Sequence, residues 1–142
     1  MWSYQHTVET TAAPAAVWEL WADVANWGAW NADITSITID GPFAEGSLIT
    51  MVPGGQDAVE LRLSEVVEHQ HFADQAEFGT LVLRTSHRLA PGEDGRTLVT
   101  YRLEITGEGA DQAGPEVGPM VSGDWPETMA ALVELAEQGG GR

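Results

Sequence analysis

The feature that most constrains the fold is a series of short alternating segments between about residue 34 and residue 105. In each segment apolar and polar residues alternate with a period of two, which is typical of half-buried β-strands. The segments cover residues 34–40, 47–52, 57–67, 71–78, 80–90 and 96–106. The turns between them are too short to hold the crossover helices that parallel strands require. The sequence therefore predicts an antiparallel meander and excludes a parallel dinucleotide-binding sheet.

The residues before this meander predict one strand and two short helices. Residues 2–9 contain several β-formers in rough alternation, so they are expected to form the first strand. Pro14 suits the first position of a helix, where its missing N–H is not needed. The apolar stripe that follows has helical spacing and consists of Val17, Leu20, Trp21 and Val24. Asn26 can then cap a second short helical turn that carries Trp27 and Trp30.

The C-terminal part of the chain predicts one long helix that covers the sheet. A Gly-rich, acidic linker is expected at residues 107–114, and a helical stripe follows it. The members of this stripe are Val117, Val121, Trp125, Met129, Leu132 and Ala136. Pro119 and Pro126 should bend or restart the helix, and Asp124 can cap its last piece.

The composition fits one acidic domain and excludes several classes of protein. The chain has 142 residues, and we expect one domain over residues 1–138 with a frayed tail at 139–142. The net charge of -16 argues against binding to nucleic acid or to anionic membranes. No stretch reaches the roughly 18 consecutive apolar residues of a membrane span, and cysteine is absent. We therefore expect a cytoplasmic protein without membrane insertion, disulfides or a nucleic-acid partner.

Acidic residues dominate the C-terminal part in particular. Between Arg102 and Arg142 the sequence has eight acidic residues and no basic one. We interpret this run as a solvated surface rather than as an acidic docking site.

The alternation within each strand also predicts which side chains face the interior. A half-buried strand places its apolar side chains on one face, so every second residue shares that face. On the last two strands the inward residues are Leu81, Leu83, Thr85, His87, Leu89, Val99, Tyr101, Leu103 and Ile105. In residues 71–78 the inward positions of Phe72 and Phe78 carry Asp74 and Ala76 with them. Four polar groups are thus expected inside, namely Asp74, Thr85, His87 and Tyr101.

The order of these elements and several local motifs resemble those of a known superfamily. The most specific motif is the stretch 13–24, followed by Trp27 and Trp30-Asn31. Further matching segments are Asp40-Gly41-Pro42-Phe43 with Gly46, Ser86-His87-Arg88-Leu89, and Ala136-Glu137. On these residues the sequence resembles the START/birch-allergen (SRPBCC) superfamily, especially its bacterial polyketide cyclase/dehydrase-like members. The resemblance covers nearly the whole chain.

This resemblance implies an α+β helix-grip fold. In that fold a curved antiparallel sheet of six to seven strands wraps around a long C-terminal helix, and two short helices follow the first strand. The resemblance also implies a cavity for a small hydrophobic molecule such as a lipid, a sterol, a polyketide or another aromatic compound. It does not imply one reaction, because the superfamily includes cyclases, hydrolases, carriers and chaperone regulators without a shared catalytic motif. The function therefore has to be argued from the cavity.

The residues expected to contact a ligand are aromatic or lie on the inward face of the sheet. They are Trp27, Trp30, Phe72, Phe78, Thr85, His87, Tyr101, Trp125 and Met129. His87 could shuttle a proton near neutral pH, with Asp74 as its orienting group or base and Tyr101 bound to a substrate oxygen. These groups would allow cyclase or dehydratase chemistry without a cofactor. The structural alternative is a satisfied histidine, a core tyrosine and an aspartate near a bulge.

Two other hypotheses stay open. His69 and His71 stand two residues apart beside Glu68, which allows metal binding, but without a third ligand this spacing favours a solvated turn and no metal. The same fold could also serve as a chaperone-regulating or protein-interaction module with a collapsed cavity and an acidic face. The sequence leaves open the identity of the ligand, any reaction, and the choice between a monomer and a homodimer.

Overall fold

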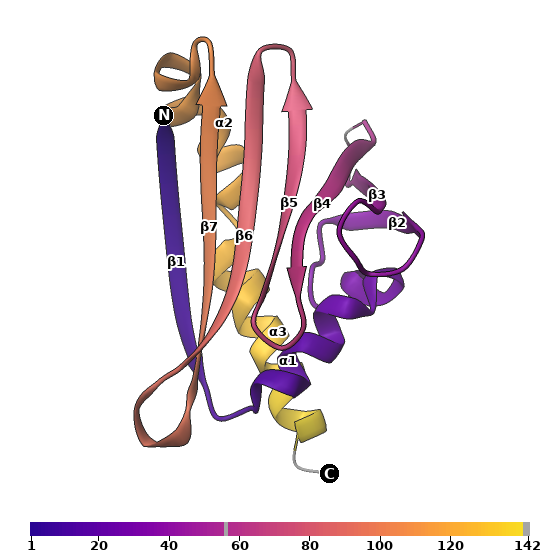
Figure 1. The fold of residues 1–142 in the computed structure, drawn as a ribbon, viewed down its shortest axis with the longest axis vertical. Helices are drawn as coiled ribbons and strands as arrows, with labels where there is room; N and C mark the ends of the chain where they lie inside the picture. Colours follow the sequence, from indigo (N-terminus) through magenta and orange to yellow (C-terminus); the bar gives the residue numbers. More distant parts are fainter. Residues whose placement is uncertain (56, 141–142) are drawn as a thin grey trace.

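A seven-stranded antiparallel sheet forms the main layer of the protein (Figure 1). The computed structural model describes residues 1–55 and 57–140. The strands are β1 (Trp2–Thr10), β2 (Ile34–Asp40), β3 (Leu48–Pro53), β4 (Val59–Val67), β5 (His71–Phe78), β6 (Leu81–Pro91) and β7 (Thr97–Gly107). Their order in the sheet is β1-β7-β6-β5-β4-β3-β2, so consecutive strands pair from β2 to β7 and β1 pairs with β7. The predicted meander is confirmed, with strand limits within two residues of those expected.

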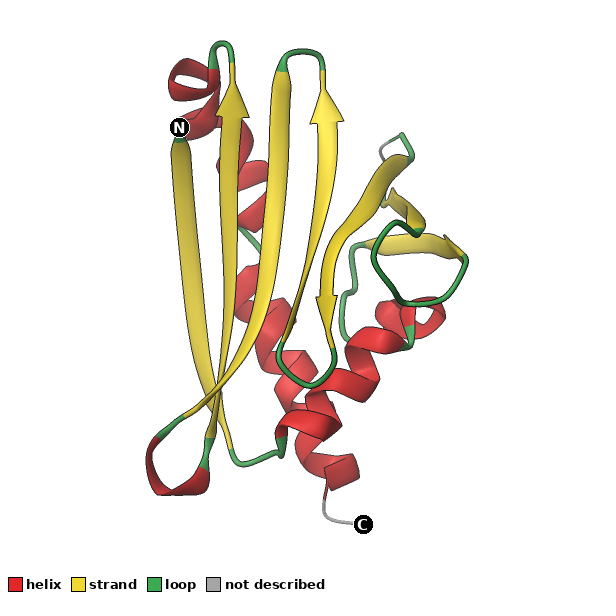
Figure 2. Cartoon of the chain, in the orientation of Figure 1, coloured by secondary structure: helices red, strands yellow, loops and turns green. Residues whose placement is uncertain are grey.

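Helices lie against one face of this sheet, which curves around them (Figure 2). The helix α1 (Pro14–Ala22) and the short 3₁₀ helix η1 (Val24–Ala29) follow β1, as the sequence predicts. The helix α2 (Ala110–Ser122) packs on β1 and β7, whereas α3 (Trp125–Gly140) packs on α1 and β1. A second 3₁₀ turn, η2 (Glu93–Gly95), joins β6 to β7. This architecture confirms the expected helix-grip fold.

Residues 107–114 do not form the linker that their composition predicts. The helix α2 already begins at Ala110, only three residues after β7 ends. Gly107 and Gly109 have φ angles of 103° and 85°, a region that other residues rarely adopt, so the chain reverses sharply from strand to helix. The glycines at the start of this segment therefore make a tight turn rather than a flexible connection.

The remaining glycines of α2 allow close packing against β1. Gly114 and Gly118 are buried, and both face the indole ring of Trp2. A Cβ atom would lie 2.3 Å from a Trp2 side-chain atom at Gly114 and 2.1 Å from one at Gly118. Both distances are shorter than any real carbon–carbon contact. The indole of the first strand is thus held against the helix backbone, and any larger residue at these positions would separate α2 from β1.

The C-terminal helical segment is divided into two helices, as its prolines predict. The helix α2 ends at Ser122, and α3 starts at Trp125. Pro126 lies in the first turn of α3, where backbone N–H groups have no partner within the helix, so the N–H that proline lacks is not needed. The backbone carbonyl of Asp124 accepts the N–H of Thr128 at 2.9 Å, which places Asp124 at the start of the new helix. The helix α3 runs to Gly140, past the expected end of the domain, and residues 141–142 lie outside the described residues.

The hydrophobic core fills the space between the helices and the concave face of the sheet. Trp21 of α1 and Phe72 of β5 are almost fully buried, and their rings meet edge to face with centroids 5.2 Å apart. In β4 a bulge lies between Leu63 and Glu65, so that Leu63 stays on the inner face opposite Asp74.

Within the described residues, no helix is long and apolar enough to cross a membrane.

Candidate functional site

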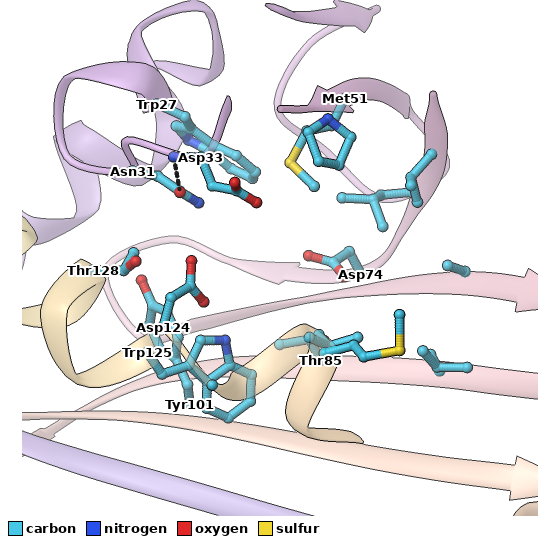
Figure 3. A pocket seen from close by; sticks show the side chains of 18 of the residues that line it. Trp27, Asn31, Asp33, Met51, Asp74, Thr85, Tyr101, Asp124, Trp125 and Thr128 are labelled. Carbon is cyan, nitrogen blue, oxygen red and sulfur yellow. Dashed lines mark hydrogen bonds between the residues drawn. The ribbon is translucent and has the colours of Figure 1, made fainter. Parts of the chain in front are cut away.

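A cavity of about 1480 Å³ opens between the sheet and the helices (Figure 3). This volume exceeds the roughly 300–1,000 Å³ that is usual for ligand pockets. Its floor is formed by every second residue of β5 and β6, as the alternation of those strands predicts. Its other walls are η1 with the loop that follows it, β3, β4, and the region where α2 gives way to α3. The break between α2 and α3 therefore lies in the wall of the cavity.

The rim of the cavity carries exposed apolar side chains. Phe78 at the end of β5 is 47% exposed, and Met120 near the end of α2 is 75% exposed. Val121 beside them is 37% exposed, so the helical stripe predicted from the sequence does not bury this residue. Exposed apolar groups at the edge of a large cavity are typical of the entrance to a site for hydrophobic molecules.

Asp74 is the buried carboxyl group of this cavity. It lies on the inner face of β5, opposite Thr85 of β6, and its side chain is only 5% exposed. No hydrogen bond or ion pair to its carboxyl group occurs within the described part of the chain. Burial raises the pKa of Asp74 to about 7, and the positive charge of Arg84 offsets this only in part. At neutral pH the group is thus present in both its protonated and its ionised form.

His87 is held as a neutral imidazole. Its ring stacks on Phe72 with centroids 3.9 Å apart and an interplanar angle of 5°. Its Nδ1 lies 3.3 Å from the carbonyl oxygen of Phe72. A carbonyl only accepts, so Nδ1 carries the proton and Nε2 is left as an acceptor. Burial lowers the pKa of His87 to about 3, so the predicted proton shuttle near neutral pH does not fit this residue.

Tyr101 supplies a neutral hydroxyl group at the same wall. The indole Nε1 of Trp21 donates a hydrogen bond to its hydroxyl oxygen at 3.2 Å. Burial raises the pKa of Tyr101, so the phenol keeps its proton at physiological pH. Its ring meets those of His87 and Trp125 edge to face, at centroid distances of 4.5 and 5.6 Å. The hydroxyl proton therefore remains available to a ligand oxygen.

The structure brings together most of the residues that the sequence assigns to ligand contact. Eight of the nine line the cavity. The exception is Met129, which is 0% exposed and belongs to the hydrophobic core. Met129 lies one turn after Trp125 on the same face of α3, at a level where this face meets the core rather than the cavity. Trp27 is fixed in its wall by a hydrogen bond from its Nε1 to the backbone carbonyl of Trp21, at 2.8 Å.

The alternative metal ligands lie elsewhere. His69 sits in the β4–β5 turn with a φ angle of 63°, and His71 contacts Glu65 on the outer face of the sheet. Within residues 1–55 and 57–140 no group of three potential ligands could hold a metal ion.

Several carboxylates of the cavity were not predicted from the sequence. Asp33, Asp57, Asp124 and Glu127 line it together with Asp74. Asp33 and Asp124 point toward one another across the cavity (Figure 3). Burial and the neighbouring charge of Asp33 raise the pKa of Asp124. The acidic run between Arg102 and Arg142 contains two of them, Asp124 and Glu127, but on its own this run indicates a solvated surface.

Comparisons with known proteins agree with this architecture. The fold is similar to that of norcoclaurine synthase from Thalictrum flavum, solved in complex with dopamine and hydroxybenzaldehyde. The two structures align with a TM-score of 0.77 at 12% sequence identity, over 96% of this chain and 87% of the other. A protein from Thermobifida fusca gives a TM-score of 0.73 at 21% identity, over 97% and 95% of the two chains. XoxI from Bacillus cereus gives 0.73 at 20% identity, over 94% of each chain. At these identities the likeness shows the fold alone.

Sequence comparison identifies the family. No curated protein matches this sequence. A family model described as polyketide cyclase/dehydrase and lipid transport matches residues 1–137, which is nearly the whole chain. The protein therefore belongs to the polyketide cyclase/dehydrase and lipid transport family.

Proposed function

We propose that this protein binds a small hydrophobic molecule in the cavity between its sheet and the junction of α2 and α3. The observation that carries the proposal is the cavity itself, which is large, mainly apolar and bordered by the exposed side chains of Phe78 and Met120. The family description and the fold are consistent with hydrophobic ligands. Aromatic rings from η1, β5 and α3 offer flat surfaces on which an apolar ligand can stack.

The alternative of a protein-interaction module has less support. That hypothesis assumes a collapsed cavity, whereas the inner face of the sheet here borders open space of about 1480 Å³. A ligand-binding protein needs such space, and an interaction module does not.

Turnover of the ligand is a second candidate, and one observation favours it. Asp74 faces the cavity without a partner within the described residues, and its pKa of about 7 suits a group that accepts and returns a proton at neutral pH. In a dehydration, the Asp74 carboxylate would take a proton from the carbon beside a ligand carbonyl. The hydroxyl of Tyr101 would stabilise the enolate oxygen by a hydrogen bond. Asp74 would then return the proton to the departing hydroxyl group, which leaves as water.

Binding can be tested first with a neutral probe. Several of the chain's tryptophans line the cavity, so titration with naphthylethanol should change the intrinsic fluorescence of the protein. The variant Ala76→Phe places a ring on the cavity floor and is expected to change the affinity. Gln75→Phe introduces the same side chain on the outer face of the same strand, and it should leave the affinity unchanged. Lack of binding up to the solubility limit of the probe would contradict the proposal.

Turnover requires a separate assay. The freshly purified protein can be compared by native and denaturing mass spectrometry to find the class of any bound molecule, and polyketides of that class can then serve as substrates. If the protein is an enzyme, its activity should change around pH 7 as Asp74 titrates, and Asp74→Asn should abolish it. Tight binding without turnover of any substrate would reject the enzyme hypothesis and leave the binding proposal intact.

A further inference from the structure

The charged groups that line the cavity are all acidic. Five carboxyl groups face it, and no lysine or arginine lies among the described residues of its lining. The single imidazole of the lining, His87, is neutral because its burial lowers its pKa to about 3. A large apolar cavity thus carries negative potential without any fixed positive charge to balance it.

Two arginines, Arg84 and Arg102, lie on the opposite face of the sheet from the cavity. Arg84 lies on the outer face of β6, where it pairs with Glu65 at 3.2 Å and with Glu104 at 3.9 Å. Arg102 lies beside it on the outer face of β7 and contacts Glu104. Arg84, the positive charge that acts on the pKa of Asp74, is therefore already paired with other carboxylates on the far side of the sheet.

A cation beside a buried carboxyl group without a partner favours its ionised form. Asp74 is 5% exposed and lines the cavity floor, and its carboxyl group makes no hydrogen bond or ion pair within residues 1–55 and 57–140. An isolated carboxylate in an apolar site is costly, and an ammonium group that donates a hydrogen bond to it would remove this cost. A metal ion is not the cation, since no three ligand groups of the described chain come together.

The aromatic walls of the cavity favour the same kind of ligand. The rings of Tyr101 and Trp125 line the cavity and lie next to Asp124 in Figure 3, and the faces of such rings attract organic cations. Asp33 and Asp124, which point toward one another nearer the surface, add negative potential that would draw a cation into the cavity.

We infer that the ligand is a hydrophobic amine, whose protonated nitrogen pairs with Asp74 while its apolar body fills the rest of the cavity. This inference rests on the proposed function and narrows it, because it selects cationic over neutral ligands and excludes fatty acids and other anions. The acidic lining repels an anionic headgroup, and the described lining has no basic side chain that could neutralise one.

Three probes that share one ring system test the inference. Naphthylethylamine is a cation at neutral pH, naphthylethanol is neutral and naphthylacetate is an anion, so the three differ mainly in charge. The amine is expected to bind at least about tenfold more tightly than the alcohol, because a charge-assisted hydrogen bond replaces a neutral one. The acid should bind more weakly than the alcohol. Isothermal calorimetry at pH 7.5 in moderate salt would measure all three affinities.

Variants separate the pairing with Asp74 from the general charge of the protein. Asp74→Asn should remove the preference for the amine and keep the binding of the alcohol. Asp40→Asn makes the same change of charge at an exposed position outside the cavity, and it should keep the preference. Equal affinity of the wild-type protein for the amine and the alcohol would overturn the inference while leaving the proposed function intact. If none of the three probes binds, both fail.

Discussion

The unpartnered carboxyl group of Asp74 should make the stability of the protein depend on pH in a defined direction. Its pKa rises from 3.8 in a model peptide to about 7 in the folded chain, because burial disfavours the charged form. Below pH 3.8 both the folded and the unfolded states carry the proton, so the group has no effect on stability. Between pH 3.8 and 7 only the folded state keeps the proton. The free energy of unfolding therefore falls as the pH rises through this window.

The size of this effect follows from the shift in pKa. About three pKa units correspond to about 4 kcal/mol of destabilisation above pH 7, of which about 2.5 kcal/mol develops between pH 5 and pH 8. Asp74→Asn replaces the carboxyl group by a neutral group of the same shape, so it removes this dependence. The variant should be more stable than the wild type, by a margin that increases toward pH 8.

Urea unfolding at several pH values from 5 to 8 would measure this margin. The comparison has to be made between variant and wild type at each pH, because His87 contributes a dependence of the opposite sign. Asp40→Asn is the matched control, since its carboxylate is exposed, and its margin should stay constant with pH. A constant margin for Asp74→Asn as well would refute the assignment of Asp74 as a buried, unpartnered acid.

Three further predictions concern other parts of the structure. His87 has a pKa of about 3 in the folded protein and 6.5 in a free histidine, so the stability of the protein is lost as the pH falls below 6.5. In the same urea assay, the stability of His87→Phe relative to the wild type should be about 2 kcal/mol greater at pH 5 than at pH 8. Gly118→Ala puts a methyl group against the Trp2 ring and should cost about 3 kcal/mol or more, whereas Gly28→Ala meets no atom within 4 Å and should be nearly neutral in thermal unfolding. Tyr101→Phe leaves a buried indole N–H without an acceptor and should cost about 1–3 kcal/mol, and a loss near zero in denaturant unfolding would contradict that hydrogen bond.

The strands were predictable from the sequence because each carries its own signal. Alternation sets which residues face inward, and the short turns leave antiparallel pairing as the only arrangement. The parity of residues 71–78 thus placed Asp74 and Phe72 on the inner face, where the structure has them. The bulge in β4 did not disturb this, because it lies on the neighbouring strand.

The errors came from properties that depend on residues far apart in the sequence. The glycines of residues 107–114 suggested a linker, but Gly107 and Gly109 make a tight turn, and Gly114 packs on the ring of Trp2, more than 100 positions away. The sequence pattern assigned Met129 to ligand contact, although only the tertiary packing of α3 decides which part of its helical stripe meets the cavity. Contacts of this kind leave no local pattern in the chain.

The chemistry of the site was the least predictable part. An average histidine titrates near neutral pH, and this made His87 the natural candidate for proton transfer. Burial beside Phe72 lowers the pKa of His87 to about 3, whereas burial raises the pKa of Asp74 to about 7. The group that titrates near neutral pH is therefore the aspartate and not the histidine. The convergence of Asp33 and Asp124 on the same cavity likewise depends on the fold rather than on spacing.

The central claim, that the cavity is a binding site for a hydrophobic molecule, is tested most directly by mapping where such a molecule binds. Amide NMR spectra of the labelled protein can be recorded during a titration with naphthylethanol. The account predicts that the largest shifts occur at Ala76 and Thr85 on the cavity floor and at Asp124 at the helix junction, with little change on the outer face at Arg102. Shifts confined to the outer face, or none up to the solubility limit of the probe, would contradict it.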